Sequence, residues 1–338
     1  MSAFDVKTAP EPQGPLCRIY SGGGQFSELT ELSRISEILV EPDAFVWLDA
    51  VDPDESDLAL MQEEFELHPL AIEDAVKAHQ RPKIEAYDNY WFVVVHAVTK
   101  AADGELTVHE IAIFAGAKFI ITVRDEPAYP LGEIERRWHG PHGALRSDSG
   151  ALLYTILDTV VDGYLPVADA LAERVEELED ALFEERLRKR DVLLEIFELK
   201  KQVQAFRRSV VPMRDLLAPI IRGDLALFDP SEIAYYRDVY DHSVRAIEQM
   251  DAARDLVTSA LEIQISISAA RQNEVVKQLS FIATIFLPLS FITGFFGQNF
   301  GYLVSHIESA PAFWFAGVGL QLAALAALLG YFRFKRWF

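Results

Sequence analysis

The end of the chain is almost free of charge. Between Gln278 and Phe332, 55 residues include a single charged side chain, Glu308. Charged residues make up 25% of the whole sequence, so a stretch of this length would ordinarily carry about 14. A surface this apolar does not face water, so the stretch cannot be the exterior of a soluble domain. This feature predicts a membrane-inserted region and limits the fold more than any other.

Two segments of this region are long enough to cross a bilayer. Residues 279–296 number 18 and residues 310–332 number 23, all without a charge. A helix rises about 1.5 Å per residue and a hydrocarbon core is roughly 30 Å thick, so both segments can span it. A buried hairpin of soluble helices is the alternative, but a soluble helix of such length would show a polar face. We therefore expect two C-terminal transmembrane helices.

Basic residues indicate the orientation. Arg271 and Lys277 precede the first span, and Arg333, Lys335 and Arg336 follow the second, whereas the loop between the spans has none. Cytoplasmic flanks carry the excess of Lys and Arg, so both termini are expected in the cytoplasm. The first residues do not show a basic segment leading into an apolar run, as a signal peptide would. The expected location is the cell (inner) membrane, with a multi-pass topology.

The remainder of the chain is strongly acidic. Residues 1–277 hold 28 Lys and Arg against 51 Asp and Glu, a net charge of −23. Such a polyanion repels nucleic acid and attracts cations, so no nucleic-acid partner is expected. The single cysteine, Cys17, excludes an intrachain disulfide and a cysteine-built metal cage.

Residues 1–145 predict an α/β cytoplasmic domain, because short β-branched or aromatic runs alternate with helical stretches. The candidate strands are Phe45 to Leu48, Tyr90 to Val95, Leu106 to Phe114 and Phe119 to Val123. Gly116 and Ala117 between the last two runs predict a hairpin, so part of the sheet is expected to be antiparallel.

Long helices are expected next. Residues 167–211 contain no Gly or Pro, and a basic cluster at 186–190 predicts a break that folds residues 146–228 into a helical hairpin. Residues 231–287 also lack Gly and Pro. This second run predicts one long helix over 229–296 that continues into the first span. The outer loop is then 297–309, and 333–338 form a basic tail.

One face of the long helix carries small or apolar residues at three- and four-residue spacing. They are Ile265, Ala269, Val276, Leu279, Ala283 and Leu287, with the polar Asn273 and Ser290 among them. Parallel copies of the helix would bury this face. Two helices cannot enclose a hydrophilic path, so a conducting protein would need several chains around an axis. No catalytic motif is present, and we expect no enzyme activity.

Gly297-Gln298-Asn299, directly after the first span, resembles the Gly-Met-Asn signature of the CorA family of divalent-cation channels. Further resemblances occur in order from about residue 40 onward: His68-Pro-Leu-Ala-Ile-Glu-Asp74, His79-Gln-Arg-Pro-Lys83, Leu152-Leu-Tyr-Thr-Ile-Leu-Asp158, Arg237-Asp-Val-Tyr-Asp-His242 and Ala283-Thr-Ile-Phe-Leu-Pro288. The resemblance implies a homopentamer with a cytoplasmic funnel, and passive uptake of Mg²⁺ with Co²⁺ or Ni²⁺ as alternatives. The divalent cation is then the transported and regulatory ligand, and no resident cofactor is expected.

The resemblance also implies three groups of site residues. Gly297, Gln298 and Asn299 form the selectivity mouth. The pore-lining positions are Glu262, Ile265, Ala269, Asn273, Val276, Leu279, Ala283, Leu287 and Ser290. Glu73, Asp74, Asp158 and Asp238 match a divalent-cation sensor between subunits, with His242 one helical turn beyond Asp238 as a further contact.

The sequence departs from the family pattern around the mouth. Gln298 replaces methionine, Phe296 replaces tyrosine, and residues 301–311 lack the usual Met-Pro-Glu run. These departures leave a ZntB-like Zn²⁺ transporter as the second hypothesis. A membrane-anchored cytoplasmic regulatory or enzymatic domain is a third. The expected pore ligands are oxygens, which favour Mg²⁺ over Zn²⁺.

Overall fold

The computed structural model describes residues 15–21, 25–29, 32–77, 79–101, 104–125, 129–138, 149–183, 189–224, 232–307 and 309–335. Glu308 lies outside these residues. The chain divides into two compact units, unit 1 up to Leu261 and unit 2 from Glu262.

Unit 1 is built on a seven-stranded mixed sheet with the order β2-β1-β3-β7-β6-β5-β4. The strands are β1 (Leu16–Ser21), β2 (Gln25–Leu29), β3 (Phe45–Val51), β4 (Lys83–Ala86), β5 (Tyr90–Lys100), β6 (Leu106–Gly116) and β7 (Phe119–Arg124). Strands β3 and β7 pair in parallel, and the other neighbours are antiparallel. The four predicted strands are confirmed as β3, β5, β6 and β7, as is the β6–β7 hairpin. Strands β1, β2 and β4 were not predicted from the sequence.

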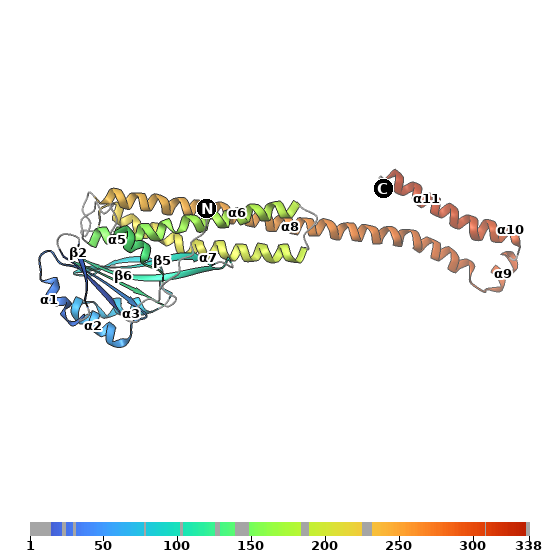
Figure 1. Cartoon of the computed structure of the whole chain (residues 1–338). Coiled ribbons are helices and arrows are strands. Elements are labelled where there is room, and N and C mark those ends of the chain that lie inside the picture. Colours follow the sequence, from blue (N-terminus) through green and yellow to red (C-terminus); the bar gives the residue numbers. More distant parts are fainter. Residues whose placement is uncertain are drawn as a thin grey trace. The chain divides into compact units, whose positions relative to one another are not determined.

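Helices cover both faces of the sheet (Figure 1). On one face lie η1 (Leu32–Arg34), α1 (Ile35–Leu39), α2 (Glu55–Phe65) and α3 (Pro69–Val76). On the other lie α4 (Gly132–Trp138), α5 (Ser149–Asp162), α6 (Tyr164–Phe183), α7 (Lys189–Ile221) and the first part of α8 (Ile233–Phe296). Successive strand residues point to opposite faces. Phe92 and Val94 of β5 therefore enter the core under α1–α3, and Val93 and Val95 enter the core under α5–α8.

The break predicted at residues 186–190 falls largely outside the described residues. Helix α6 ends at Phe183, α7 begins at Lys189, and the two helices pack together. Tyr164 of α6 meets Phe206 of α7 edge to face, with ring centroids 5.9 Å apart. Helix α7 continues through Pro212 and Pro219 to Ile221, although proline removes a backbone hydrogen bond from a helix interior.

Helix α8 runs for 64 residues without a break. The predicted continuity of this helix into the first apolar segment is therefore confirmed. Unit 2 consists of the part of α8 from Glu262 onward, α9 (Gly301–Ile307), α10 (Ala310–Ala312), the π-helix η2 (Phe313–Gly319) and α11 (Leu320–Phe334).

Three helical stretches are long and apolar enough to cross a membrane: Ser149–Ala181, Ile233–Phe296 and Ala310–Phe334. In its most apolar window the first is 61% buried inside the structure, whereas the corresponding windows of the other two are 0% buried. The first stretch is a core element of unit 1. The other two overlap the segments that the sequence predicts to cross the bilayer, and we call them the first and second candidate spans.

Candidate functional site

The residues predicted to line a pore form one exposed face of α8. The set comprises Glu262, Ile265, Ala269, Asn273, Val276, Leu279, Ala283, Leu287 and Ser290, and every one is exposed. Leu279 and Leu287 retain 65% and 72% of their full exposure. An apolar face that nothing in one chain covers is available to other copies of the chain or to lipid.

A different face of α8 meets the second candidate span. Phe281, Ile285, Leu289 and Ile292 are half-buried on that face. The ring of Phe281 packs edge to face on Phe332 of α11, with centroids 5.1 Å apart. With 3.6 residues per turn, this face lies roughly 150° around the helix from the face that holds Leu279, Ala283, Leu287 and Ser290. The predicted pore face therefore points away from the chain's own second candidate span.

The predicted mouth begins where α8 ends. Gly297 donates its backbone N–H to the carbonyl of Thr293 at 2.9 Å, and Gln298 donates to Phe295 at 3.3 Å. A Cβ atom at position 297 would stand 3.0 Å from the Thr293 carbonyl oxygen, so glycine permits this close turn. Gln298 and Asn299 follow in non-helical backbone and are exposed. Their side-chain amides can accept hydrogen bonds from water or from a hydrated ion.

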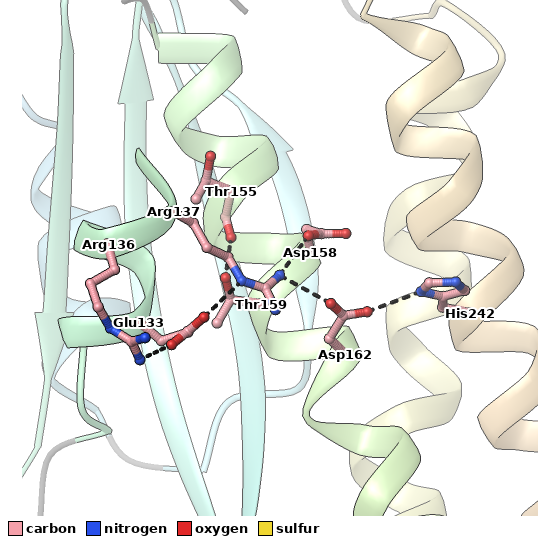
Figure 2. A network of polar contacts seen from close by, with 8 residues as sticks. All are labelled: Glu133, Arg136, Arg137, Thr155, Asp158, Thr159, Asp162 and His242. Carbon is pink, nitrogen blue, oxygen red and sulfur yellow. Dashed lines mark hydrogen bonds and ion pairs between the residues drawn. The ribbon is translucent and has the colours of Figure 1, made fainter. Parts of the chain in front are cut away.

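In unit 1, a polar network centres on Arg137 of α4, which Figure 2 shows between Asp158 and Asp162 of α5. Its Nη1 donates to Asp158 Oδ2 at 2.8 Å and to Asp162 Oδ2 at 3.0 Å, and its Nε donates to Glu133 Oε1 at 3.1 Å. The other oxygen of Asp162 lies 3.0 Å from Nδ1 of His242 on α8. This Arg137 network, made of Arg137, Glu133, Asp158, Asp162 and His242, links α4, α5 and α8.

Asp158 is the most buried of the three carboxylates that Arg137 contacts. The side chain of Asp158 is 16% exposed. Burial raises the pKa of Asp158, Asp162 adds to the increase, and Arg137 and His242 oppose it. Nearby, burial followed by the charges of Asp158 and Asp238 raises the pKa of Tyr154 to about 12.

Asp238 is an exposed residue of α8 whose charge helps to raise the pKa of Asp158 and of Tyr154. Among the residues that the structure describes, Asp238 forms no ion pair with Arg237 or Arg245. The predicted sensor residues Asp158, Asp238 and His242 thus lie on α5 and α8, which cover the same face of the sheet, and the Asp238 carboxylate is exposed.

Glu73 and Asp74 lie elsewhere, on α3. Asp74 Oδ2 accepts a hydrogen bond from Lys83 Nζ at 2.6 Å, and Lys83 Nζ also lies 3.0 Å from Glu85 Oε1. Burial lowers the pKa of Lys83, but the hydrogen bonds to Asp74 and Glu85 outweigh it, so the pKa is raised overall. Glu73 is 62% exposed and lies 3.8 Å from Lys77.

The sheet separates these two groups of predicted sensor residues. Helix α3 packs against the sheet face opposite to the one that α5 and α8 cover. In the described part of the chain, no cluster of three or more His, Cys, Asp or Glu side chains is arranged to hold a metal ion. A site containing both groups would require two copies of the chain.

Asp162 and Arg137 were missed by the sequence analysis. Asp162 follows Asp158 by four residues, and residues so spaced share a helix face, so that signal was available. Arg137 precedes Asp158 by 21 residues and belongs to a separate helix. No local pattern pairs them, because the fold alone brings α4 beside α5.

The family model described as CorA-like Mg²⁺ transporter protein matches residues 42–336. The chain is 33% identical to YfjQ of Bacillus subtilis over 304 residues, 89% of this chain and 93% of YfjQ. It is 28% identical to the cobalt/magnesium transport protein CorA of Thermotoga maritima over 279 residues, 81% of this chain and 77% of that protein. A zinc transport protein ZntB, from Pectobacterium carotovorum, is 27% identical over 56% of this chain and 57% of its own length.

A solved structure agrees with the fold. The CorA magnesium transporter of Methanocaldococcus jannaschii superimposes with a TM-score of 0.76 at 21% identity, covering 94% of this chain and 97% of that one. At that identity the likeness concerns the fold.

Proposed function

Since the chain belongs to the CorA-like Mg²⁺ transporter family, we propose that it forms a homopentameric channel. Family membership makes it a divalent metal-ion transporter and not an enzyme. The channel admits hydrated Mg²⁺ passively across the cell (inner) membrane, and Co²⁺ or Ni²⁺ can take its place. One observation carries this proposal. The exposed face of α8 points away from the second candidate span, as a pore face shared by several copies would.

In the proposed assembly the first candidate span lines the pore and the second faces lipid. The basic residues flanking the two spans favour a cytoplasmic position for both termini. Most of the exposed α8 face is apolar, and rings of Val276, Leu279 and Leu287 would disfavour a continuous column of water. Such rings form a hydrophobic gate that closes by dewetting.

The mouth selects a hydrated ion. Mg²⁺ releases its waters reluctantly, and those waters direct their hydrogens outward. A ring of Asn299 side-chain oxygens and nearby backbone carbonyls would accept those hydrogens without stripping the ion. Gln298 adds a further acceptor in each copy, because its side chain is exposed beside Asn299.

We further propose that cytoplasmic Mg²⁺ regulates the channel at sites between copies. Glu73 and Asp74 of one copy would meet Asp158, Asp238 and His242 of the next, which is consistent with their separation within one chain. Like charges brought together repel by about 1 kcal/mol per close pair in water. A bound divalent cation reverses the sign, ties the copies together and holds the pore closed.

The ZntB-like hypothesis remains as the second candidate, because Gln298 departs from the family signature and a ZntB protein is among the relatives. Zn²⁺ prefers nitrogen and sulfur ligands, whereas the described mouth offers amide and carbonyl groups. Family membership removes the hypothesis of a membrane-anchored enzymatic domain.

The deciding experiment measures uptake of Mg²⁺, Co²⁺, Ni²⁺ and Zn²⁺ into proteoliposomes that contain the full chain. The Asn299→Ala protein should lose most Mg²⁺ uptake. The matched Asn89→Ala protein, altered at an exposed position of unit 1, should keep it. Parental uptake by Asn299→Ala would remove that residue from the mouth. Zn²⁺ flux that exceeds Mg²⁺ flux and follows a proton gradient would establish the second candidate instead.

A further inference from the structure

One side-chain hydrogen bond joins the two candidate spans near the mouth. Gln321 of α11 donates from Nε2 to Oγ1 of Thr293 on α8 at 2.9 Å. The Thr293 hydroxyl in turn donates to the Leu289 carbonyl at 2.9 Å, and the Thr293 carbonyl accepts the N–H of Gly297. A single residue of α8 thus contacts both the second span and the first residue of the mouth.

The amide of Gln321 stands in apolar surroundings. Among residues 313–332, only Trp314, Gln321 and Tyr331 have side chains with a polar group, and Gln321 alone has an amide. An amide is unfavourable in hydrocarbon unless it finds a hydrogen-bond partner, and between membrane helices such a bond replaces an unsatisfied group. Thr293 provides that partner, so the bond holds a specific pairing of the two helices.

The backbone before Gln321 is unusual in a way that sets the direction of its side chain. The π-helix Phe313–Gly319 ends just before it, and the N–H of Leu320 donates to the carbonyl of Phe315, five residues earlier. A π-helical turn contains one residue more than an α-helical turn. Each π-helical turn therefore rotates the side chains that follow it by about 100° relative to an uninterrupted α-helix. A Cβ atom at Gly319 would stand 3.1 Å from the Trp314 carbonyl oxygen. Glycine there accommodates the wide turn that directs Gln321 toward Thr293.

We propose that Gln321 is a positioning residue of the mouth. Its amide fixes the last turn of α8 through Thr293, so that the Gly297-Gln298-Asn299 segment of every copy holds its acceptors at one height and orientation. Loss of the amide loosens the ring and weakens discrimination among hydrated divalent ions, while the path itself stays open. This inference rests on the proposed function, since it assigns a role in selectivity.

The first test compares ion preference in proteoliposomes. Gln321→Leu and Thr293→Val should reduce the ratio of Mg²⁺ to Co²⁺ uptake about threefold. A hydrogen bond between two membrane helices changes an equilibrium constant by about this factor on average. Thr293→Ser keeps the hydroxyl and should restore the parental ratio. The exchange of Gln321→Leu with Leu322→Gln keeps the composition of the span but turns the amide away, and should behave like Gln321→Leu. An exchange variant or a Gln321→Leu variant with the parental ratio overturns the proposal.

The second test examines the bond independently of transport. Thermal unfolding of the purified full chain in detergent is measured for Gln321→Leu, Thr293→Val and the double variant. The effects should be non-additive, because either substitution already breaks the bond. Additive effects overturn the proposal. If the parental protein moves no divalent ion, the proposed function fails, whereas non-additivity would still establish the helix pairing.

Discussion

Arg137 Nη1 lies 2.8 Å from Asp158 Oδ2, so a carboxylate assigned to cation sensing already has a cation within its own chain. The same nitrogen donates to Asp162 (Figure 2). A divalent ion that binds Asp158 must therefore share or displace the guanidinium. This relationship makes Arg137 a tethered competitor of the regulatory ion in the proposed mechanism.

Replacing Arg137 with Gln should make the sensor bind Mg²⁺ more tightly, because the competing positive charge is lost. Arg137 is 35% exposed, and half-exposed ion pairs are screened by solvent. We therefore expect the Mg²⁺ concentration for half-maximal protease protection to fall about twofold to fivefold. Arg137→Lys retains the charge and serves as the control. An unchanged or higher midpoint in Arg137→Gln would exclude competition at Asp158.

A fixed positive charge at Asp238 should imitate the bound ion. Asp238 is exposed, so Asp238→Lys is not expected to disturb packing within the chain. The variant should stay protease-protected at low Mg²⁺. Asp74→Lys is predicted to act in the same direction, but it removes the partner of Lys83 and is the less clean test. Asp255→Lys, elsewhere on α8, controls for charge reversal. Parental Mg²⁺ dependence in both sensor variants would refute the sensor assignment.

Periodic and compositional signals account for much of what the sequence predicted. The apolar end of the chain, the unbroken helix α8 and strands β3, β5, β6 and β7 each have a local pattern of the right period. Strand β4 has only four residues, in which the charged Lys83 and Glu85 alternate with Ile84 and Ala86, and so short an alternation is a weak signal. Proline at 212 and 219 is a local stop signal that the packing of α7 overrides.

Polar partnerships could not be predicted in the same way. Gln321 and Thr293 are 28 residues apart, and their contact depends on a π-helix that no composition rule indicates. Arg137 and Asp158 meet only because α4 and α5 share a face of the sheet. Such pairs depend on tertiary geometry, because one additional residue in a helical turn is enough to point a side chain in another direction.

Replacing Leu287 with Asn should raise ion leak through the closed channel, because a polar ring holds water where an apolar ring excludes it. Leu287 is 72% exposed on the proposed pore face. Leu289→Asn places the same amide on the face that meets the second candidate span, and should leave the leak unchanged. Currents across planar bilayers at saturating Mg²⁺ measure the difference. Equal leaks in the two variants would move the gate away from Leu287.

Gly116→Ala should destabilise unit 1 by roughly 1–3 kcal/mol, the usual effect of overpacking. A Cβ atom there would stand 2.3 Å from the ring of Phe119, and both residues belong to the β6–β7 hairpin. Gly132→Ala is the matched control, because outside its chain neighbours and its own helix backbone no heavy atom lies within 4 Å of the added Cβ. Thermal unfolding of the two purified variants provides the comparison. Similar midpoints would show that the Phe119 ring moves aside.

The last prediction concerns pH and His96 of β5. Its Nε2 lies 2.8 Å from the Gln80 carbonyl oxygen and 3.9 Å from Glu110 Oε2, and its buried Nδ1 has no hydrogen-bond partner among the described residues. Burial lowers the pKa of His96 below its ordinary 6.5, although the Gln80 carbonyl opposes the shift.

The sign of the effect follows from where the proton binds. Below about pH 6.5 the unfolded chain takes up a proton that folded His96 resists, so the free energy of unfolding should fall as the pH falls through this range. Burial raises the pKa of Glu110 above its ordinary 4.5. This group therefore makes the free energy of unfolding fall as the pH rises above about 4.5, which is the opposite of the His96 effect. His96→Gln keeps an N–H for Gln80 but does not titrate, and Glu110→Gln isolates the other slope. The midpoint of thermal unfolding should therefore differ between parental and His96→Gln proteins by an amount that changes below about pH 6.5 and is constant above it. A difference that is constant throughout would show that His96 takes up its proton equally in the folded and unfolded chains.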